Sequence, residues 1–74
     1  MDNQHRKIKG YRELDQVEID LMNSIKALGG NLGESVAALE ITEGVDQRWV
    51  AIGKTHLQQG LMALTRAVAK PDFF

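Results

Sequence analysis

Cysteine is missing from this 74-residue sequence, which also holds only one proline and two histidines. Without cysteine the chain can form neither a disulfide bond nor a thiolate-bound metal site. His5 and His56 are too few, and have too few suitable neighbours, to build a zinc centre. We therefore expect no metal and no cofactor. We expect a chain this short to gain stability by associating with other copies.

Long apolar runs are missing as well. No stretch approaches the roughly eighteen consecutive apolar residues that mark a membrane-spanning helix. The first residues also lack the apolar core of a secretory signal. These absences predict a soluble protein that acts in the cytoplasm and makes no contact with a membrane.

Aromatic residues make up 5% of the sequence, and together with the β-branched residues they are too sparse for a sheet. Helical periodicity dominates instead and predicts one helix over about 15–39. Asp15 is a suitable N-cap, and Glu18 completes a capping box. Three glycines within 29–33 predict a weak or kinked stretch, with a break as the alternative. The expected apolar stripe of this helix is Leu14, Val17, Leu21, Ile25, Leu28, Leu32, Val36 and Leu39.

A second helix is predicted over about 47–70, since Asp46 can cap its start and Pro71 ends it. Two helices of similar length joined by a short turn form a helical hairpin. The predicted fold is therefore all-α. The apolar stripe expected on the second helix is Val50, Leu57, Leu61, Leu64 and Val68. The single domain 1–74 divides into an arm (1–14), a helix (15–39), a turn (40–46), a helix (47–70) and a tail (71–74).

A second face of the second helix is rich in small residues. Small side chains on a helix let another backbone approach closely, and a tryptophan at one end is a natural interface anchor. We expect this face to assemble copies of the chain into a symmetric oligomer. The alternative is that it covers the N-terminal arm of its own chain. The face comprises Trp49, Gly53, His56, Gly60, Ala63 and Ala67.

Charge is unevenly distributed along the chain. The first twelve residues carry a net charge of +3, whereas the remainder carries −4. This segregation indicates a local anion site in place of a uniformly basic coat for DNA. Tyr11 adds an aromatic face on which a nucleobase can stack. The alternative is a solvated basic tail with Tyr11 as a buried anchor.

No arrangement of residues argues for catalysis. The sequence has no nucleophile with its base and no phosphate-binding loop, so we expect no catalytic residues and no enzyme. Anion binding is better supported. Lys26 lies in the middle of the first helix, and Lys54, Thr55 and His56 follow one another on the second, with Arg48 nearby. Consecutive helix residues diverge by about 100°, so these three serve one ligand only where two chains meet. Taken singly, each is equally compatible with an exposed helix side chain.

Four segments resemble a small family of bacteriophage proteins, the anti-CBASS sponges, whose helical hairpin is shared with a Thoeris anti-defence sponge. The resemblance covers roughly 5–28 and 47–70, and the middle of the chain is shorter than the family pattern. The matching segments are HRKIKGYREL at 5–14, IDLMN at 19–23, RWVAIGKTHLQ at 48–58 and GLMALTRAV at 60–68.

The resemblance implies a protein that binds cyclic oligonucleotide messengers in the cytoplasm of an infected bacterial host and sequesters them without cleavage. It also implies a homohexamer with separate inter-subunit pockets for cyclic dinucleotides and cyclic trinucleotides. In this sequence it assigns Tyr11 and Lys26 to the dinucleotide pocket. Arg48, Lys54, Thr55 and His56 are the candidates for the trinucleotide pocket.

Two other functions remain open at this stage. A small phage DNA-binding regulator could use the basic arm in a minor groove, although the net charge of −1 and acidic helices argue against duplex nucleic acid as a partner. A structural helical adaptor could instead bind a partner protein through the charged arm. Only the sponge makes cyclic nucleotides the ligand.

Overall fold

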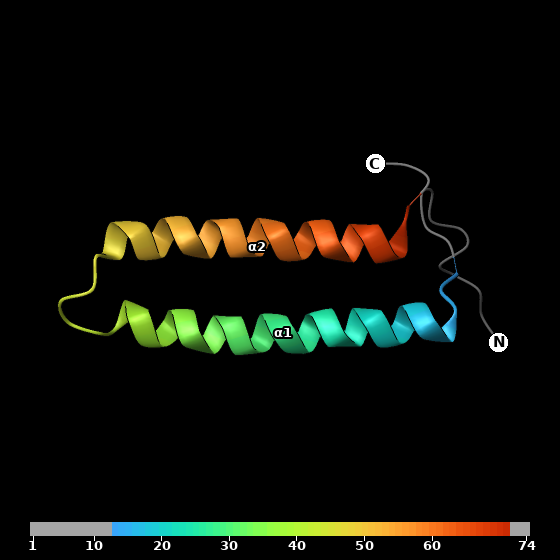
Figure 1. Ribbon diagram of the computed structural model, residues 1–74, viewed down its shortest axis with the longest axis horizontal. Coiled ribbons are helices and arrows are strands. Elements are labelled where there is room, and N and C mark those ends of the chain that lie inside the picture. Colours follow the sequence, from blue (N-terminus) through green and yellow to red (C-terminus); the bar gives the residue numbers. More distant parts are fainter. Residues whose placement is uncertain (1–12, 72–74) are drawn as a thin grey trace.

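The computed structural model describes residues 13–71. Two helices, α1 (Gln16–Glu40) and α2 (Gln47–Ala69), run side by side in opposite directions and are joined by a short turn (Figure 1). No strand occurs in the described part. The expected all-α helical hairpin is therefore confirmed. The basic arm over 1–12, with Tyr11, and the tail residues 72–74 lie outside the described residues.

The start of α1 is fixed by a reciprocal pair of side chains. The Asp15 carboxylate accepts the backbone N–H of Glu18 at 2.9 Å, and the Glu18 carboxylate accepts the backbone N–H of Asp15 at 3.0 Å. This is the capping box expected from the sequence, and it satisfies two of the N–H groups that a helix start leaves unpaired. Such a cap stabilises a helix by about 0.5–2 kcal/mol.

The glycine-rich stretch does not interrupt α1, which is continuous from Gln16 to Glu40. The expected single helix is confirmed, and the alternative of a break is wrong. Gly29 lies on the side of α1 that faces α2. A Cβ at Gly29 would lie 3.4 Å from Cδ1 of Leu61, about van der Waals contact, so α2 packs close to α1 at this level. At Gly30 and Gly33 nothing lies within 4 Å of such a Cβ.

The turn between the helices is closed by side chains. The Asp46 carboxylate accepts the backbone N–H groups of Arg48 and Trp49 at 3.0 and 3.4 Å, which confirms Asp46 as the cap of α2. Gln47 Nε2 donates to the carbonyl of Leu39 at 3.0 Å and so ties the start of α2 to the end of α1. Gly44 has a φ of 89°, a conformation that favours glycine.

At the open end of the hairpin, α2 finishes at Ala69. Lys70 takes a left-handed conformation with φ of 44° and donates its N–H to the Arg66 carbonyl at 2.8 Å. Pro71 follows and cannot continue the helix. The Lys70 ammonium lies 3.9 Å from the Glu18 carboxylate, so an ion pair links the end of α2 to the start of α1.

The contact between the helices differs from the expected stripe. Leu57 and Leu64 of α2 are exposed, and four of the expected α1 positions are exposed too, including Val17 at 67%. Helical periodicity alone gives an apolar stripe on α1 that is wider than one helix can cover. In the structure α2 packs along one side of this stripe, the side next to Gly29. The exposed α1 positions are Val17, Leu21, Leu28 and Leu39. The half-buried positions are Leu14, just before α1, and Ile25, Leu32 and Val36 of the expected stripe, together with Glu18, Met22 and Gly29, which were not expected.

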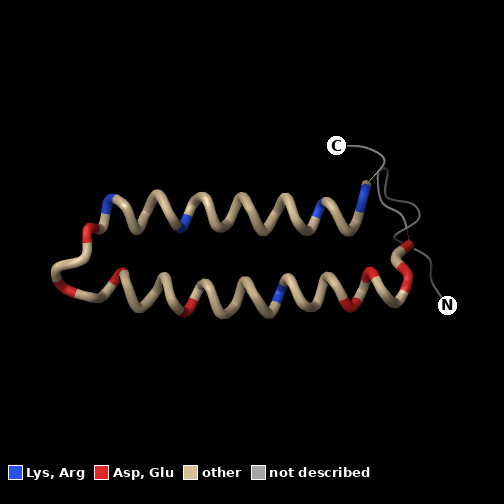
Figure 2. The backbone as a smooth tube through the Cα atoms, in the orientation of Figure 1, with Lys and Arg blue, Asp and Glu red and all other residues tan. Residues whose placement is uncertain are grey.

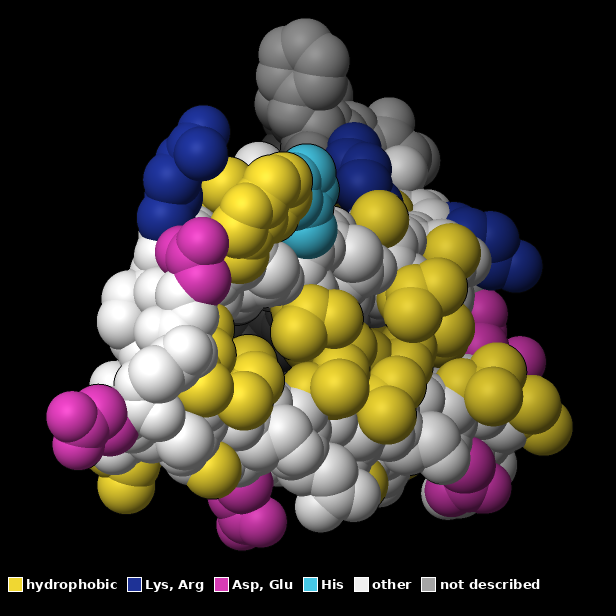
Figure 3. All heavy atoms as spheres, turned by 60° about the vertical axis from the view of Figure 1, so that its left-hand side comes forward, with side chains coloured by type: hydrophobic (Ala, Val, Ile, Leu, Met, Phe, Trp, Pro, Cys, Tyr) yellow, Lys and Arg dark blue, Asp and Glu magenta, His cyan; other side chains and the backbone are white. Residues whose placement is uncertain are grey.

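The hairpin has no buried core of its own. No residue within 13–71 is buried, and hydrophobic side chains form a patch on the face that Figure 3 shows. The whole chain exposes 6080 Å² of surface, against about 4,500 Å² for a compact monomer of this mass. Large hydrophobic side chains of both helices, among them Val17, Trp49 and Met62, are part of the exposed surface. One hairpin therefore leaves apolar surface uncovered.

We predict opposite effects for two glycine substitutions. Gly30→Ala should stabilise the protein by about 0.5–1 kcal/mol, because alanine loses less backbone entropy in a helix and the added methyl meets nothing. Gly44→Ala should destabilise it by about 1–2 kcal/mol, because its backbone is left-handed. Urea unfolding followed by circular dichroism at one protein concentration measures both. A destabilising Gly30→Ala would show that another backbone packs against this part of α1.

Candidate functional site

Charges of opposite sign lie on the two helices (Figure 2). The sequence of α1 contains four carboxylates and one basic residue, Lys26. The sequence of α2 contains no carboxylate and three basic residues, Arg48, Lys54 and Arg66. The expectation that both helices are acidic is therefore wrong, because an average over the chain hides the difference between them. Anion-binding chemistry within 13–71 is confined to α2, its C-cap Lys70 and one position of α1.

Lys26 is exposed and unpaired within the described part of the chain. Its side chain is exposed in the middle of α1, one residue beyond the half-buried Ile25. Among the described residues it has neither an ion-pair nor a hydrogen-bond partner. A phosphate at this position would therefore not have to displace a carboxylate of residues 13–71 from the ammonium group.

Lys54 is in a different situation. Its Nζ lies 3.3 Å from Oε2 of Glu40, which links the two helices near the turn. It also borders an open groove of about 300 Å³ between the helices, along which Gly33 and Ala37 of α1 lie. The charge of Lys54 is thus partly satisfied within the hairpin, and the ion pair must open or share a ligand if Lys54 binds an anion.

Thr55 and His56 lie together and apart from Lys54. Both line a shallow hollow with Ala51 and Ile52 on the surface of α2. The Thr55 hydroxyl donates to the Ala51 carbonyl at 3.1 Å and keeps its lone pairs for a further donor. His56 also borders an apolar groove between the helices, together with Leu28 and Leu64.

Arg48 is separated from both groups. Its guanidinium lies 5.8 Å from the centre of the Trp49 ring, a cation–π arrangement at the start of α2. One chain therefore brings Thr55 and His56 together, whereas Lys54 borders the groove between the helices. The spacing of seven residues puts Arg48 on the same side of α2 as Thr55 but two turns, about 10 Å, away along the helix. A single ligand that contacts all four residues would therefore need more than one chain.

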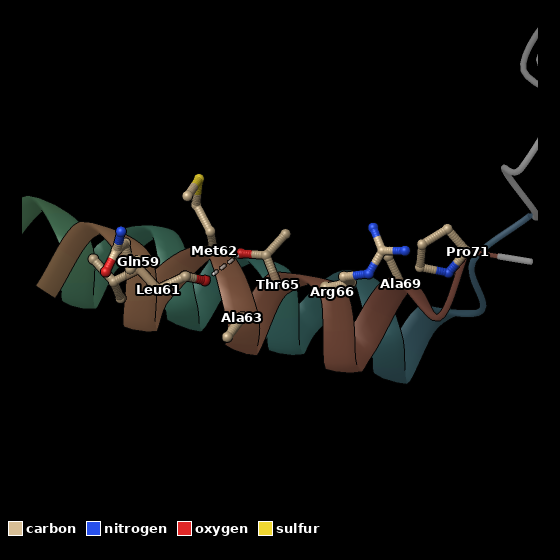
Figure 4. A pocket seen from close by; sticks show the side chains of 8 residues that line it. All are labelled: Gln59, Leu61, Met62, Ala63, Thr65, Arg66, Ala69 and Pro71. Atoms are coloured by element: carbon tan, nitrogen blue, oxygen red, sulfur yellow. Dashed lines mark hydrogen bonds between the residues drawn. The ribbon is translucent and has the colours of Figure 1, made fainter. Parts of the chain in front are cut away.

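A further groove follows the second half of α2, with a volume of about 650 Å³ (Figure 4). Met62 and Thr65 point to the same side of the helix, whereas Ala63 points away. The Thr65 hydroxyl donates to the Leu61 carbonyl at 2.9 Å. Arg66 adds a guanidinium to this lining. Arg66 is not predicted as a site residue from the sequence, because a basic residue near a helix C-terminus is ordinary and gives no specific signal.

The described residues lack a metal-binding cluster and a membrane-spanning helix. They contain no group of three or more histidine, cysteine, aspartate or glutamate side chains that could hold a metal ion. Neither described helix is long and apolar enough to cross a membrane.

Comparison with known proteins relates this chain to a protein family and to a phage protein. A family model described as "Acb2/Tad1, hairpin domain" matches residues 3–69. "Anti-CBASS protein 2" of Pseudomonas phage JBD67 is 39% identical, over 97% of this chain and 98% of the relative. That alignment spans 106 positions, more than the 74 residues of this chain, so the relative has residues without a counterpart here.

We predict that the ion pair between Glu40 and Lys54 contributes little to stability. A double-mutant cycle with Glu40→Ala and Lys54→Ala should give a coupling energy of about 0.2–1 kcal/mol, because both side chains are roughly half exposed. High salt should reduce this coupling further. Urea unfolding of the four proteins measures it. A coupling well above this range would mean that the pair is shielded from water, for example by another copy.

Proposed function

This chain belongs to the Acb2/Tad1 hairpin family, and from that membership we propose that it is a phage-encoded anti-CBASS sponge. It binds cyclic di- and trinucleotide messengers of the host defence and sequesters them without cleavage. The observation that carries the proposal is the match to an anti-CBASS protein over 97% of the chain, which spans both halves of the hairpin. The expected resemblance to the anti-CBASS family is confirmed by the same match.

The proposed cyclic dinucleotide site combines Tyr11 and Lys26. A cyclic dinucleotide has two bases and two phosphates, so two chains that each supply one tyrosine and one lysine match its composition. Stacking of a base on an aromatic ring contributes about 1–3 kcal/mol. The exposed ammonium of Lys26 neutralises a phosphate that would otherwise be buried without a partner. Two copies of one simple half-site thus make a complete pocket.

The proposed cyclic trinucleotide site draws on Arg48, Lys54, Thr55 and His56. Lys54 borders a different hollow from Thr55 and His56, and Arg48 lies two turns before Thr55, which supports a pocket assembled from more than one chain. Arg48 supplies a planar guanidinium that can bind a phosphate through two hydrogen bonds. Lys54 supplies an ammonium once it exchanges Glu40 for the ligand.

The proposed assembly is a homohexamer with three-fold and two-fold axes. It is supported by the absence of any buried residue within 13–71 and by the large surface that one hairpin exposes. An oligomer covers this surface and at the same time brings half-sites from different chains together. A monomer would leave both the apolar faces and the proposed pockets incomplete.

Sequestration requires tight binding and many copies but no turnover. The residues proposed to contact the messenger are a tyrosine, basic side chains and a threonine. His56 belongs to the same set and lies beside Thr55, but the Thr55 hydroxyl donates to the Ala51 carbonyl and not to the imidazole, so no enzyme activity is proposed. Acting in the cytoplasm of the infected host, the protein would lower the free messenger concentration below what the defence effector needs.

Duplex nucleic acid is a poorer ligand for this hairpin. The three basic residues of α2 are spread over a 23-residue helix whose partner carries four carboxylates. Duplex binding typically uses several closely spaced phosphate contacts and falls steeply with salt. Isothermal titration with cyclic dinucleotides, cyclic trinucleotides and a DNA duplex tests the proposed function directly. Binding of the duplex alone would favour a regulator of transcription.

We predict that Tyr11→Ala and Lys26→Ala each weaken cyclic dinucleotide binding by roughly 10–100-fold. The first removes a stacking surface and the second a charge-assisted hydrogen bond of about 1.5–3 kcal/mol. Isothermal titration calorimetry measures the loss. Cyclic trinucleotide binding should persist in both variants, because it uses other residues.

Tyr11→Phe is the matched control for stacking and should keep most of the affinity, since the ring is retained. Gln58→Ala, which removes an uncharged exposed side chain of α2, controls for general damage to the surface. Unchanged cyclic dinucleotide affinity in both alanine variants would show that the site lies elsewhere.

We predict that the bound messenger is recovered chemically intact. After prolonged incubation, heat or protease should release the same cyclic nucleotide that was added, because the proposed site contains no nucleophile with its base. Chromatography with mass spectrometry identifies the product. Recovery of linear nucleotide would replace the sponge with a phosphodiesterase.

A further inference from the structure

Glu18 is a carboxylate in an unusual place. It is half-buried, like Met22 one turn further along α1, and only 13% of its side-chain surface is exposed. A glutamate is seldom covered to this extent unless it is paired. Its partners include the backbone N–H of Asp15, 3.0 Å from Oε1, and the Lys70 ammonium, 3.9 Å from Oε2. Glu18 therefore joins the start of α1 to the end of α2.

The hydrogen bond to Asp15 acts on the chain that precedes the helix. The N–H of Asp15 belongs to the planar peptide group that joins Leu14 to Asp15. Its bond to Glu18 therefore orients this peptide group against α1, and with it the direction from which the chain enters the helix. The side chain of Leu14 is half-buried and adds a second attachment at the same junction.

The start of α2 lacks this arrangement. Asp46 caps α2 with its own carboxylate, but the third position of the helix is Trp49, which has no side-chain oxygen to return a hydrogen bond. The 23 residues of α2 are nevertheless helical without a break. A one-sided cap is thus sufficient to start a helix of this hairpin. The reciprocal bond and the ion pair are found at the described helix start that follows the arm.

Tyr11 precedes this junction by a short piece of chain. Only three residues separate it from Leu14 in number, and three residues span at most about 11 Å when fully extended. A fixed junction therefore restricts where the ring can lie relative to α1. A loose junction would have to be ordered when a ligand binds, and ordering the backbone of one residue lowers an equilibrium constant by roughly 5–30-fold. Fixing the junction in advance removes this cost from binding.

We propose that Glu18 is a positioning residue for the cyclic dinucleotide site. Through Asp15 it sets the direction of the arm that carries Tyr11, and through Lys70 it ties that direction to α2. The inference rests on the proposed function, in which the Tyr11 ring stacks on a base. Glu18 itself does not touch the ligand, and its effect on affinity is transmitted by the backbone at the junction.

Glu18→Met tests the positioning role, because it removes the acceptor oxygen but keeps an unbranched side chain of similar length at this half-buried place. Circular dichroism should show a folded hairpin, whereas isothermal titration should show cyclic dinucleotide binding weakened by about 5–30-fold. Cyclic trinucleotide binding should be unchanged, because its proposed residues lie on α2. Glu18→Gln keeps an oxygen that accepts the Asp15 N–H, so it should retain most of the affinity.

Asp46→Ala is the matched control for loss of a helix cap. It removes the capping carboxylate of α2 at the far end of the hairpin, so it should lower stability without changing cyclic dinucleotide affinity. Urea unfolding at one protein concentration compares its stability with that of Glu18→Met. Equal losses of cyclic dinucleotide affinity in the two variants would show that affinity follows stability alone, and the positioning role would be wrong.

The Tyr11→Ala background is the decisive comparison. There Glu18→Met should weaken binding by less than about twofold, because the ring that Glu18 positions is absent. An equal loss in both backgrounds, or an unchanged affinity of Glu18→Met, would overturn the positioning role and leave the sponge function standing. If Glu18→Met does not fold, Glu18→Ala takes its place in both backgrounds. A natural protein that binds no cyclic dinucleotide would overturn the proposed function and this inference together.

Discussion

The structure depends on the fact that two helices cannot enclose a core. Each helix has only one neighbour within the chain, so α2 covers a narrow strip of α1 and leaves the rest of its apolar surface in solvent. The close approach at Gly29 makes this strip compact but does not make it wide. The shape of the hairpin is thus set by the caps of its helices and by the single contact between α1 and α2. Its remaining apolar surface is available for contact between subunits.

The same constraint governs the proposed binding chemistry. A hairpin only two helices thick has no interior pocket in which to collect polar groups, and its basic side chains point to different sides. Lys26 is the only basic residue of α1, whereas on α2 Lys54 faces away from Thr55 and Arg48 lies two turns before Thr55 along the helix. Convergence of these groups on one ligand must come from symmetry. Association and binding are therefore two aspects of one event in the proposed sponge.

The parts of the fold that depend on neighbouring residues could be predicted from the sequence. The capping box of Asp15 and Glu18, the Asp46 cap and the continuity of α1 all follow from spacing within one or two turns. The contact between α1 and α2 could be predicted less well, because periodicity does not say which side of a wide apolar stripe meets the partner helix. In the structure α2 lies along the side of the stripe next to Gly29, which faces Leu61. The site residues were chosen through a resemblance, and Tyr11 lies outside the described residues, so their roles remain proposals.

The ion pairs at the two ends of the hairpin have a consequence for its mechanical behaviour. Glu40 meets Lys54 near the turn, and Glu18 meets Lys70 at the open end. Sliding one helix along the other by a single turn, about 5.4 Å, would break both pairs at once. Each such surface pair adds little to folding energy, but both form only at the native offset of the two helices. Both therefore favour this offset over its nearest alternatives, so subunits would enter an assembly with the same geometry.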